Sequence, residues 1–301
     1  MYLKKILLLC SLFLIAGATA GFAAKWKAKH VVLIGIDGWG AYSVPKADIP
    51  NIKSLMNAGC YTLEKRSVLP SASAINWASM FNGAGTEIHG YTTWGSRTPE
   101  IPSRVVNEHG IFPTIFSLLH DQEPQAETGC LYEWDGIKYL IDTLSVKHFA
   151  IAPDYEKNQG LLCSMAEQYI KDKKPAFVAV CFDQLDHVGH AQGHDTKAYY
   201  DKLKQLDGYV GKIISALKEA GIYDDTIIML TSDHGGVGKG HGGKTLLEMQ
   251  IPFIIAGKNV KHGGKFNESM MQYDTAATIA YIFGLKQPQA WIGRPMVQVF
   301  K

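Results

Sequence analysis

Acidic and histidine side chains follow three apolar segments of the chain, close to the point where each segment ends. Asp37 comes directly after HVVLIGI, which is typical of a buried strand. The segments AFVAVCF and TIIMLT are followed by Asp183–His190 and by Asp233–His234. In open parallel sheets, ligands bind at the carboxyl ends of strands. One carboxylate there is an ordinary cap or turn residue, but three such positions, two with histidine, indicate a binding site.

The residue types and their spacing favour a metal site. Asp186 and His190 are four residues apart and can bind one ion together. His241 follows His234 by seven residues, within the glycine-rich stretch GGVGKGHGG, whose backbone can fold tightly around an ion. Carboxylate oxygens and imidazole nitrogens suit Zn²⁺. Three aspartates and three histidines are enough for two zinc ions about 4 Å apart, an arrangement that serves in-line phosphoryl displacement.

Other histidines are given no ligand role, because a single histidine is more often a surface or core residue. This group comprises His89, His109, His120, His148, His187, His194 and His262.

A candidate nucleophile lies in the segment Ser71-Ala72-Ser73, between a predicted strand and a predicted helix. A hydroxyl at a helix N-terminus is close to the positive end of the helix dipole and to free backbone N–H groups, which makes a natural phosphate site. A serine there is equally typical of a simple N-cap. Spacing alone does not separate Ser71 from Ser73.

The rest of the chain predicts the elements that position these residues. Strands are expected at 30–36, 61–69, 125–131, 176–182, 226–231 and 251–256. Helices are expected at 50–58, 74–82, 113–121, 154–172, 196–219 and 274–283, with a loop over 84–110. This alternation predicts an α/β fold with a largely parallel sheet covered by helices on both faces. No linker divides residues 24–301, so we expect one domain.

Composition excludes several classes of protein. Of 301 residues, 47% are hydrophobic and 19% are charged, a globular rather than a disordered balance. The 30 basic and 28 acidic residues give a net charge of +2, so no strong field favours binding to a nucleic acid polymer.

The N-terminus has the pattern of a signal peptide, expected over residues 1–23. Lys4 and Lys5 precede the apolar run 6–15, and small residues follow at 16–20. The run is too short for a span of about 20 residues. A lipoprotein anchor on Cys10 is disfavoured by the bulky Leu9. We therefore expect export to a periplasm or beyond, with no membrane span in the mature chain.

Four cysteines remain after removal of that segment: Cys60, Cys130, Cys163 and Cys181. Their spacing matches no zinc ribbon. Cys181 lies in an apolar run and is expected to be buried. Disulfide pairing stays open.

The ordered motifs resemble the alkaline phosphatase superfamily, and within it the type I phosphodiesterase/nucleotide pyrophosphatase branch. They are Asp37-Gly38, Ser73-x-x-Asn76, Asp186-x-x-Gly189-His190, Ser232-Asp233-His234-Gly235 and His241-Gly242. That branch has a glycine ten residues after its nucleophile, and Gly83 is ten residues after Ser73. The resemblance therefore selects Ser73. It also implies an alkaline-phosphatase-like sandwich as the fold.

The resemblance implies two zinc sites and a phosphoseryl intermediate. Asp186, His190 and His241 would hold one ion. Asp37, Asp233 and His234 would hold the other, with Ser73 bound to it as an activated nucleophile. Asn76 would donate a hydrogen bond to a non-bridging phosphoryl oxygen. The implied substrate is a small phosphate ester; the oligomeric state is open.

The chain is shorter than typical members of that branch, so some specificity contacts are expected to be missing. Aromatic residues could line a leaving-group pocket, although packing is the commoner role for each: Trp77, Tyr91, Trp94, Tyr132 and Trp134. Lys239 and Lys244 flank His241 and could contact an anion, although solvated lysines are the commoner case.

Three alternatives remain. A sulfatase would need a C/S-x-P-x-R motif, which the segment after Ser71 or Ser73 lacks. A phosphomonoesterase would use the same ions with an extra cation on the phosphate; the neutral Asn76 and the absence of a nearby motif arginine favour a diester. A non-catalytic binding protein is disfavoured because every expected ligand is present.

Overall fold

The computed structural model describes residues 26–301. The expected signal peptide and Cys10 therefore lie outside the described residues. Within the described part, no helix is long and apolar enough to cross a membrane.

The fold is built on a sheet of eight strands in the order β4-β3-β5-β1-β6-β7-β2-β8. Five neighbouring strands are parallel: β4 (His148–Ile151), β3 (Thr128–Tyr132), β5 (Phe177–Phe182), β1 (His30–Ile36) and β6 (Thr226–Thr231). The predicted largely parallel sheet is confirmed.

Strand β7 (Gln250–Gly257) is the exception, because it runs antiparallel to both of its neighbours, β6 and β2 (Cys60–Arg66). Two antiparallel steps restore the direction, so β2 runs the same way as β6. The short strand β8 (Gly264–Lys265) pairs with β2 at the edge of the sheet.

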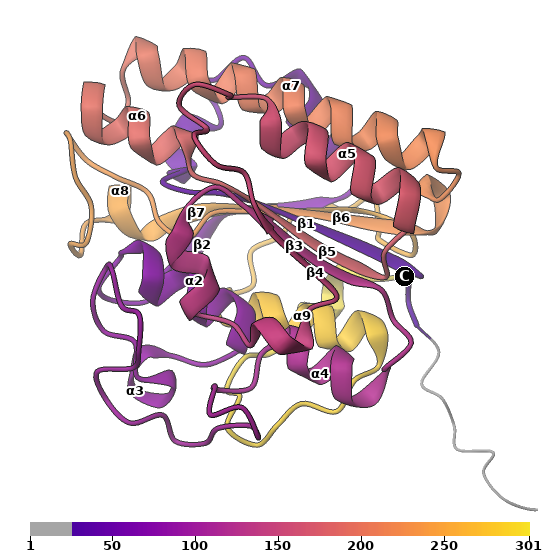
Figure 1. The fold of residues 1–301 in the computed structure, drawn as a ribbon. Helices are drawn as coiled ribbons and strands as arrows, with labels where there is room; N and C mark the ends of the chain where they lie inside the picture. The colour runs from indigo at the N-terminus through magenta and orange to yellow at the C-terminus, as the bar shows by residue number, and fades with distance from the viewer. Residues whose placement is uncertain (1–25) are drawn as a thin grey trace, which may run out of the picture.

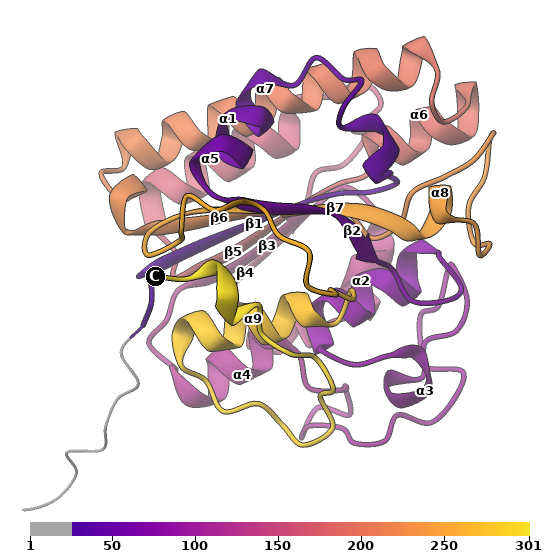
Figure 2. The same cartoon turned by 180° about the vertical axis from the view of Figure 1, so that it is seen from behind.

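Helices cover both faces of the sheet, as Figures 1 and 2 show. One layer comprises α1 (Pro50–Ala58), α5 (Leu161–Lys173), α6 (Gln184–Gln192) and α7 (Lys197–Glu219). The other comprises α2 (Ser73–Asn82), α3 (Thr86–His89), α4 (Ile115–Gln122) and α9 (Asp274–Phe283). Helix α8 (Leu246–Met249) precedes β7, and 3₁₀ turns occur at Ala41–Ser43, Asp135–Tyr139, Thr143–Ser145, Tyr223–Asp225 and Val297–Val299.

The two-sided cover explains the continuous apolar runs of the central strands. In β1, Val32 and Ile34 pack into one helical layer, whereas Val31 and Leu33 pack into the other. A strand buried on both faces needs apolar residues at every position.

Several boundaries differ from the sequence-based expectation. The helix predicted over 154–172 begins only at Leu161, because turns that include Asp154 at φ +50° occupy the preceding segment. The strand predicted over 61–69 ends at Arg66. Strand β4 and helices α3 and α6 were not predicted. The four cysteines are free and buried, as expected for Cys181.

The topology brings the candidate residues to one edge of the sheet. Strands β1, β5 and β6 are parallel, so the segments that follow them start from the same edge. Strand β2 points the same way and leads through a short loop into α2, which begins at Ser73.

Candidate active site

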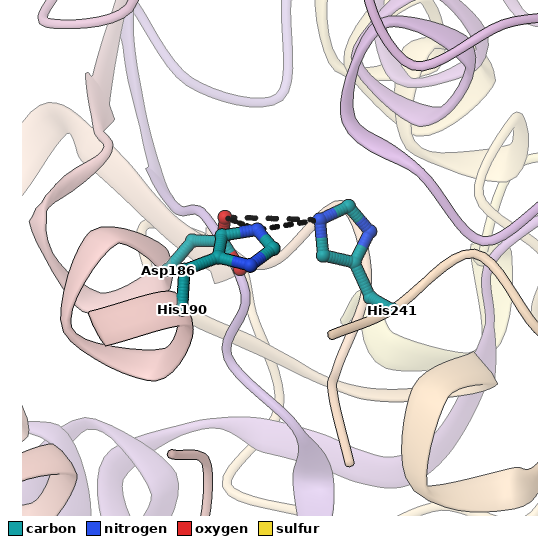
Figure 3. A group of neighbouring side chains, drawn as sticks. All are labelled: Asp186, His190 and His241. Carbon is teal, nitrogen blue, oxygen red and sulfur yellow. Dashed lines mark hydrogen bonds and ion pairs between the residues drawn. The ribbon is translucent and has the colours of Figure 1, made fainter. Parts of the chain in front are cut away.

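The first cluster joins Asp186, His190 and His241 (Figure 3). Asp186 and His190 are four residues apart on α6, and His190 Nε2 lies 3.0 Å from Asp186 Oδ2. His241 comes from the loop after β6. Its Nε2 lies 3.1 Å from His190 Nε2 and 3.8 Å from Asp186 Oδ2. One atom of each side chain lies within 4.8 Å of the others, close enough for a shared ion.

The second cluster surrounds His234, which is fully buried. Its Nε2 lies 3.4 Å from Asp37 Oδ1 and 3.2 Å from Asp233 Oδ2. The same nitrogen lies 3.1 Å from Ser73 Oγ. Asp186 is also close to Asp37 and His234, so it borders both clusters.

The three imidazoles are held by the same kind of contact. Each Nδ1 contacts a backbone carbonyl, which leaves Nε2 pointing into the site. The carbonyls belong to Lys239 for His190 (2.9 Å), Gly235 for His234 (2.8 Å) and Ser71 for His241 (3.1 Å). Histidines that bind metals usually donate their other ring N–H in this way, which fixes the tautomer and the ring.

Two buried carboxylate oxygens support the presence of a cation here. Asp37 Oδ1 and Asp233 Oδ2 have no hydrogen-bond partner in the described structure. Buried charges without partners are costly unless they are paired or bind a metal. The donor set of carboxylate oxygens and imidazole nitrogens fits Zn²⁺.

The pKa values of the aspartates also favour a bound cation at this site. Burial, with the nearby Asp233 and Asp186, raises the pKa of Asp37 well above its usual value. Burial and Asp186 raise the pKa of Asp233 to about 7. Burial acts upward on the pKa of Asp186 as well, but the nearby imidazoles of His190 and His194 lower it overall. These carboxylates repel one another, and a bound cation would relieve the repulsion.

The three histidines of the clusters differ in the direction in which their pKa values are shifted. Burial lowers the pKa of His234 and brings that of His241 to about 4, so both are neutral, as metal binding requires. The hydrogen bond that His190 donates to Asp186 raises the pKa of His190 to about 9. Metal binding must therefore displace a proton from His190.

The two serines differ in their partners. Ser71 donates its hydroxyl hydrogen bond to the carbonyl of Gly243 at 2.6 Å. Ser73 is the first residue of α2 and its Oγ contacts His234. Helix α2 has no side-chain N-cap, so its positive end is available to an anion.

The role expected for Asn76 needs correction. Its Nδ2 is within hydrogen-bond distance of the carbonyls of Val68, Pro70 and Ala72, at 3.1 Å each. Its Oδ1 accepts from the N–H of Val68 at 2.7 Å. The amide is completely used in holding the loop before α2, so it has no free donor for a phosphoryl oxygen.

Of the two roles considered for Trp77, the structure shows packing. It is buried, and its Nε1 donates to Asp37 Oδ2 at 2.8 Å. The ring passes over Gly35, where an added Cβ would lie 2.3 Å from it. Trp77 therefore orients a carboxylate of the second cluster and does not line a leaving-group pocket.

A pocket of about 620 Å³ opens beside the first cluster, with His190 and His241 in its wall. Trp94, whose side chain is 68% exposed, is the aromatic residue among its walls. The other aromatic candidates, Tyr91, Tyr132 and Trp134, do not line it. Neither Lys239 nor Lys244 lines it, and the lining contains no lysine or arginine: Pro70, Ala72, Thr92, Thr93, Trp94, His190, His241 and Gly242.

Sequence reasoning gave His194 no role, yet its buried ring lies against Asp186. Its Nε2 is 3.4 Å from Asp186 Oδ1. The spacing of four residues from His190 was the available signal, although α6 ends before His194.

Comparisons with known proteins show the fold and the family of this chain. The chain is 22% identical over 246 residues to the mouse bis(5'-adenosyl)-triphosphatase enpp4, covering 78% of this chain and 53% of that protein. Its fold matches murine ectonucleotide pyrophosphatase/phosphodiesterase 5, an inactive variant solved with AMP, with TM-score 0.72, 13% identity, and coverage of 90% and 98%. A 2-O GAG sulfatase matches with TM-score 0.71, 15% identity, and coverage of 91% and 74%.

The chain thus spans about half the length of enpp4. The solved structures establish the fold, which is alkaline-phosphatase-like. A family model described as type I phosphodiesterase/nucleotide pyrophosphatase matches residues 31–241, a range that holds both clusters and Ser73. This chain belongs to the type I phosphodiesterase/nucleotide pyrophosphatase family.

Proposed function

We propose that this protein is a two-zinc phosphoesterase that hydrolyses phosphodiester or nucleotide pyrophosphate bonds through a covalent intermediate on Ser73. The observation that carries the proposal is the position of Ser73. Its Oγ contacts the second cluster, while the pocket beside it is bordered by His190 and His241 of the first. A substrate in that pocket would lie against the first cluster, and the pocket wall at Ala72 adjoins Ser73.

The ligands divide between the two clusters. Asp186, His190 and His241 would hold one ion, and the other would be held by Asp37, Ser73, Asp233 and His234. Bound zinc supplies charge neutralisation and a lowered pKa for a coordinated hydroxyl or water.

The reaction follows from the positions of the chain's own groups. Ser73 Oγ forms a bond to phosphorus while the bond to the leaving oxygen breaks, and water then cleaves the serine ester. With a diester, the intermediate keeps the second organic group. The uncapped N-terminus of α2 faces the same reacting group and stabilises its negative charge.

The pocket favours a diester over a monoester. A monoester carries two negative charges that an extra cation helps to neutralise, and the lining has no lysine or arginine. A diester has one charge and an added organic group, for which the exposed face of Trp94 offers apolar contact. The name of enpp4, a bis(5'-adenosyl)-triphosphatase, fits this class of substrate.

Trapping the intermediate tests the proposal. Zinc-loaded protein is quenched in acid during turnover of bis-nitrophenyl phosphate, digested, and analysed by mass spectrometry. We expect a nitrophenyl phosphoryl adduct on the peptide that contains Ser73, and none in Ser73→Ala. Turnover with an adduct on another residue would refute the role of Ser73.

We also propose that the chain is exported and that its signal peptide is cleaved near residue 23. N-terminal sequencing of protein recovered from the periplasm or medium should begin within residues 21–25. Retention of Met1 in the native host would contradict export by this route.

A further inference from the structure

The two oxygens of Asp186 face different partners. Oδ2 lies 3.0 Å from His190 Nε2 and 3.8 Å from His241 Nε2, on the side of the first cluster. Oδ1 lies 3.4 Å from Nε2 of His194, whose side chain is fully buried. His194 is therefore placed to hold the carboxylate from the side that the first cluster does not use.

Neither atom of this contact has another partner. Nε2 of His194 and Oδ1 of Asp186 are both buried and have no hydrogen bond in the described structure. An unpaired buried polar atom is costly. A short approach of His194 toward Asp186 satisfies both atoms at once.

The ring of His194 is held differently from the three imidazoles of the clusters. The carbonyl of Gly238 already accepts the backbone N–H of His194 at 2.7 Å, and Nδ1 is further away, at 3.3 Å. In the cluster histidines the corresponding Nδ1 contacts are 2.8 to 3.1 Å. A carbonyl only accepts hydrogen bonds, so this contact exists only while Nδ1 carries the proton. At 3.3 Å it is longer than the cluster contacts, so little is lost when His194 carries its proton on Nε2 instead, as a donor and not as a metal ligand.

Two glycines make room for this ring. An added Cβ would lie 2.4 Å from His194 Nε2 at Gly189 and 2.3 Å from it at Gly236. Gly189 belongs to α6 and Gly236 to the loop after β6, so two separate elements leave space for the same imidazole.

We propose that His194 is a positioning residue of the metal centre. Its Nε2–H donates to Oδ1 of Asp186, which fixes the carboxylate with Oδ2 turned toward His190 and His241. Groups that orient a metal ligand in this way typically contribute 10- to 100-fold to metal affinity. The inference rests on the metal sites of the proposed function and adds a residue that lies outside both of them.

Two substitutions of His194 separate hydrogen bonding from packing. His194→Phe keeps a ring of similar size but removes the donor, whereas His194→Gln places an amide N–H near the position of Nε2. Metal-free protein is titrated with zinc against a chromogenic chelator. In the Phe variant we expect about 10- to 100-fold weaker binding at one site and an unchanged second site. The Gln variant should stay within a few-fold of wild type.

Two further variants serve as a control and as an independent test. His187→Ala removes an exposed histidine of α6, whose ion pair in the described structure is with Glu156 at 3.8 Å, and should bind both ions normally. Gly236→Ala leaves His194 intact but displaces its ring, because the added Cβ would lie 2.3 Å from Nε2, so it should reproduce the loss even if the Phe variant fails to fold.

Normal zinc binding by both His194→Phe and Gly236→Ala would overturn the role of His194. A Gln variant as weak as the Phe variant would do the same, as would variants that lower the melting temperature of metal-free protein without changing zinc affinity. If wild-type protein itself bound no zinc, the proposed function would fail as well, so the two failures are distinguishable.

Discussion

Ser71 and Ser73 are two residues apart but face different groups, one a backbone carbonyl and the other His234. We predict that Ser73→Ala lowers kcat for a diester by several orders of magnitude, as expected on losing a nucleophile. Ser71→Ala should keep most of the activity, because its hydroxyl contacts only Gly243 in the described structure. Steady-state rates with matched zinc content check this. A dead Ser71→Ala variant beside an active Ser73→Ala variant would place the nucleophile two residues earlier.

The sequence was informative about residue types at the site and less so about side-chain directions. The ligand set could be predicted because carboxylates and histidines recur after apolar strands. The role of Asn76 could not be predicted, since its position as the fourth residue of α2 permits its amide to turn either toward substrate or back to the preceding loop. The structure shows the second arrangement. His194 lies beyond the end of α6, where helical spacing no longer predicts which way a side chain points.

At the scale of elements, the loop between β2 and α2 depends on Asn76. Asn76→Ala would leave the N–H and carbonyl of Val68 and the carbonyls of Pro70 and Ala72 without that partner. We expect a loss of about 1–3 kcal/mol in the free energy of unfolding. Activity should fall with it, because the loop fixes the start of α2 and hence Ser73.

Thermal unfolding of metal-free Asn76→Ala, together with its kcat at saturating zinc, checks this role. Matched changes in both quantities support it. An unchanged melting temperature with a large loss of kcat would instead restore Asn76 as a direct donor to substrate.

Element types were predictable because burial on both faces produces continuous apolar runs at β1, β5 and β6. The direction of β7 was not, since an apolar run of its length is compatible with parallel or antiparallel pairing. The reversal matters for the site, because it sets β2 parallel to β6 and so directs α2 to the same edge.

At the scale of the whole molecule, the buried carboxylate of Asp233 lowers the stability of the metal-free protein when it is ionised. The fold raises the pKa of Asp233 from 3.8 to about 7. As the pH rises from about 4 to 7, the unfolded chain therefore releases this proton first, and the stability of metal-free protein falls. We predict that metal-free Asp233→Asn is more stable than wild type at pH 8, by a few kcal/mol, and that the difference vanishes near pH 4.

Melting temperatures of chelator-treated protein across that range provide the measurement. Zinc should reverse the order at pH 8, since it stabilises wild type and Asp233→Asn lacks a ligand. A difference between the two metal-free proteins that does not depend on pH would contradict the assignment.

Metal content tests how the ligands divide. We predict two zinc ions in wild-type protein and close to one in His241→Ala, because the ligands of the second cluster remain intact. Elemental analysis after gel filtration gives the ratio of zinc to protein. Active protein without a bound transition metal would be inconsistent with both sites.

The central claim is that this site hydrolyses phosphodiesters, and one comparison of rates tests it most directly. Zinc-loaded protein is assayed with bis-nitrophenyl phosphate, nitrophenyl phosphate and nitrophenyl sulfate at one pH. Because the described pocket lining contains no lysine or arginine, the account predicts that the diester has the highest kcat/KM, about ten- to a hundredfold above the monoester. A monoester turned over more than tenfold better than the diester would contradict it, and sulfate ester turnover above both would place the protein with the sulfatases.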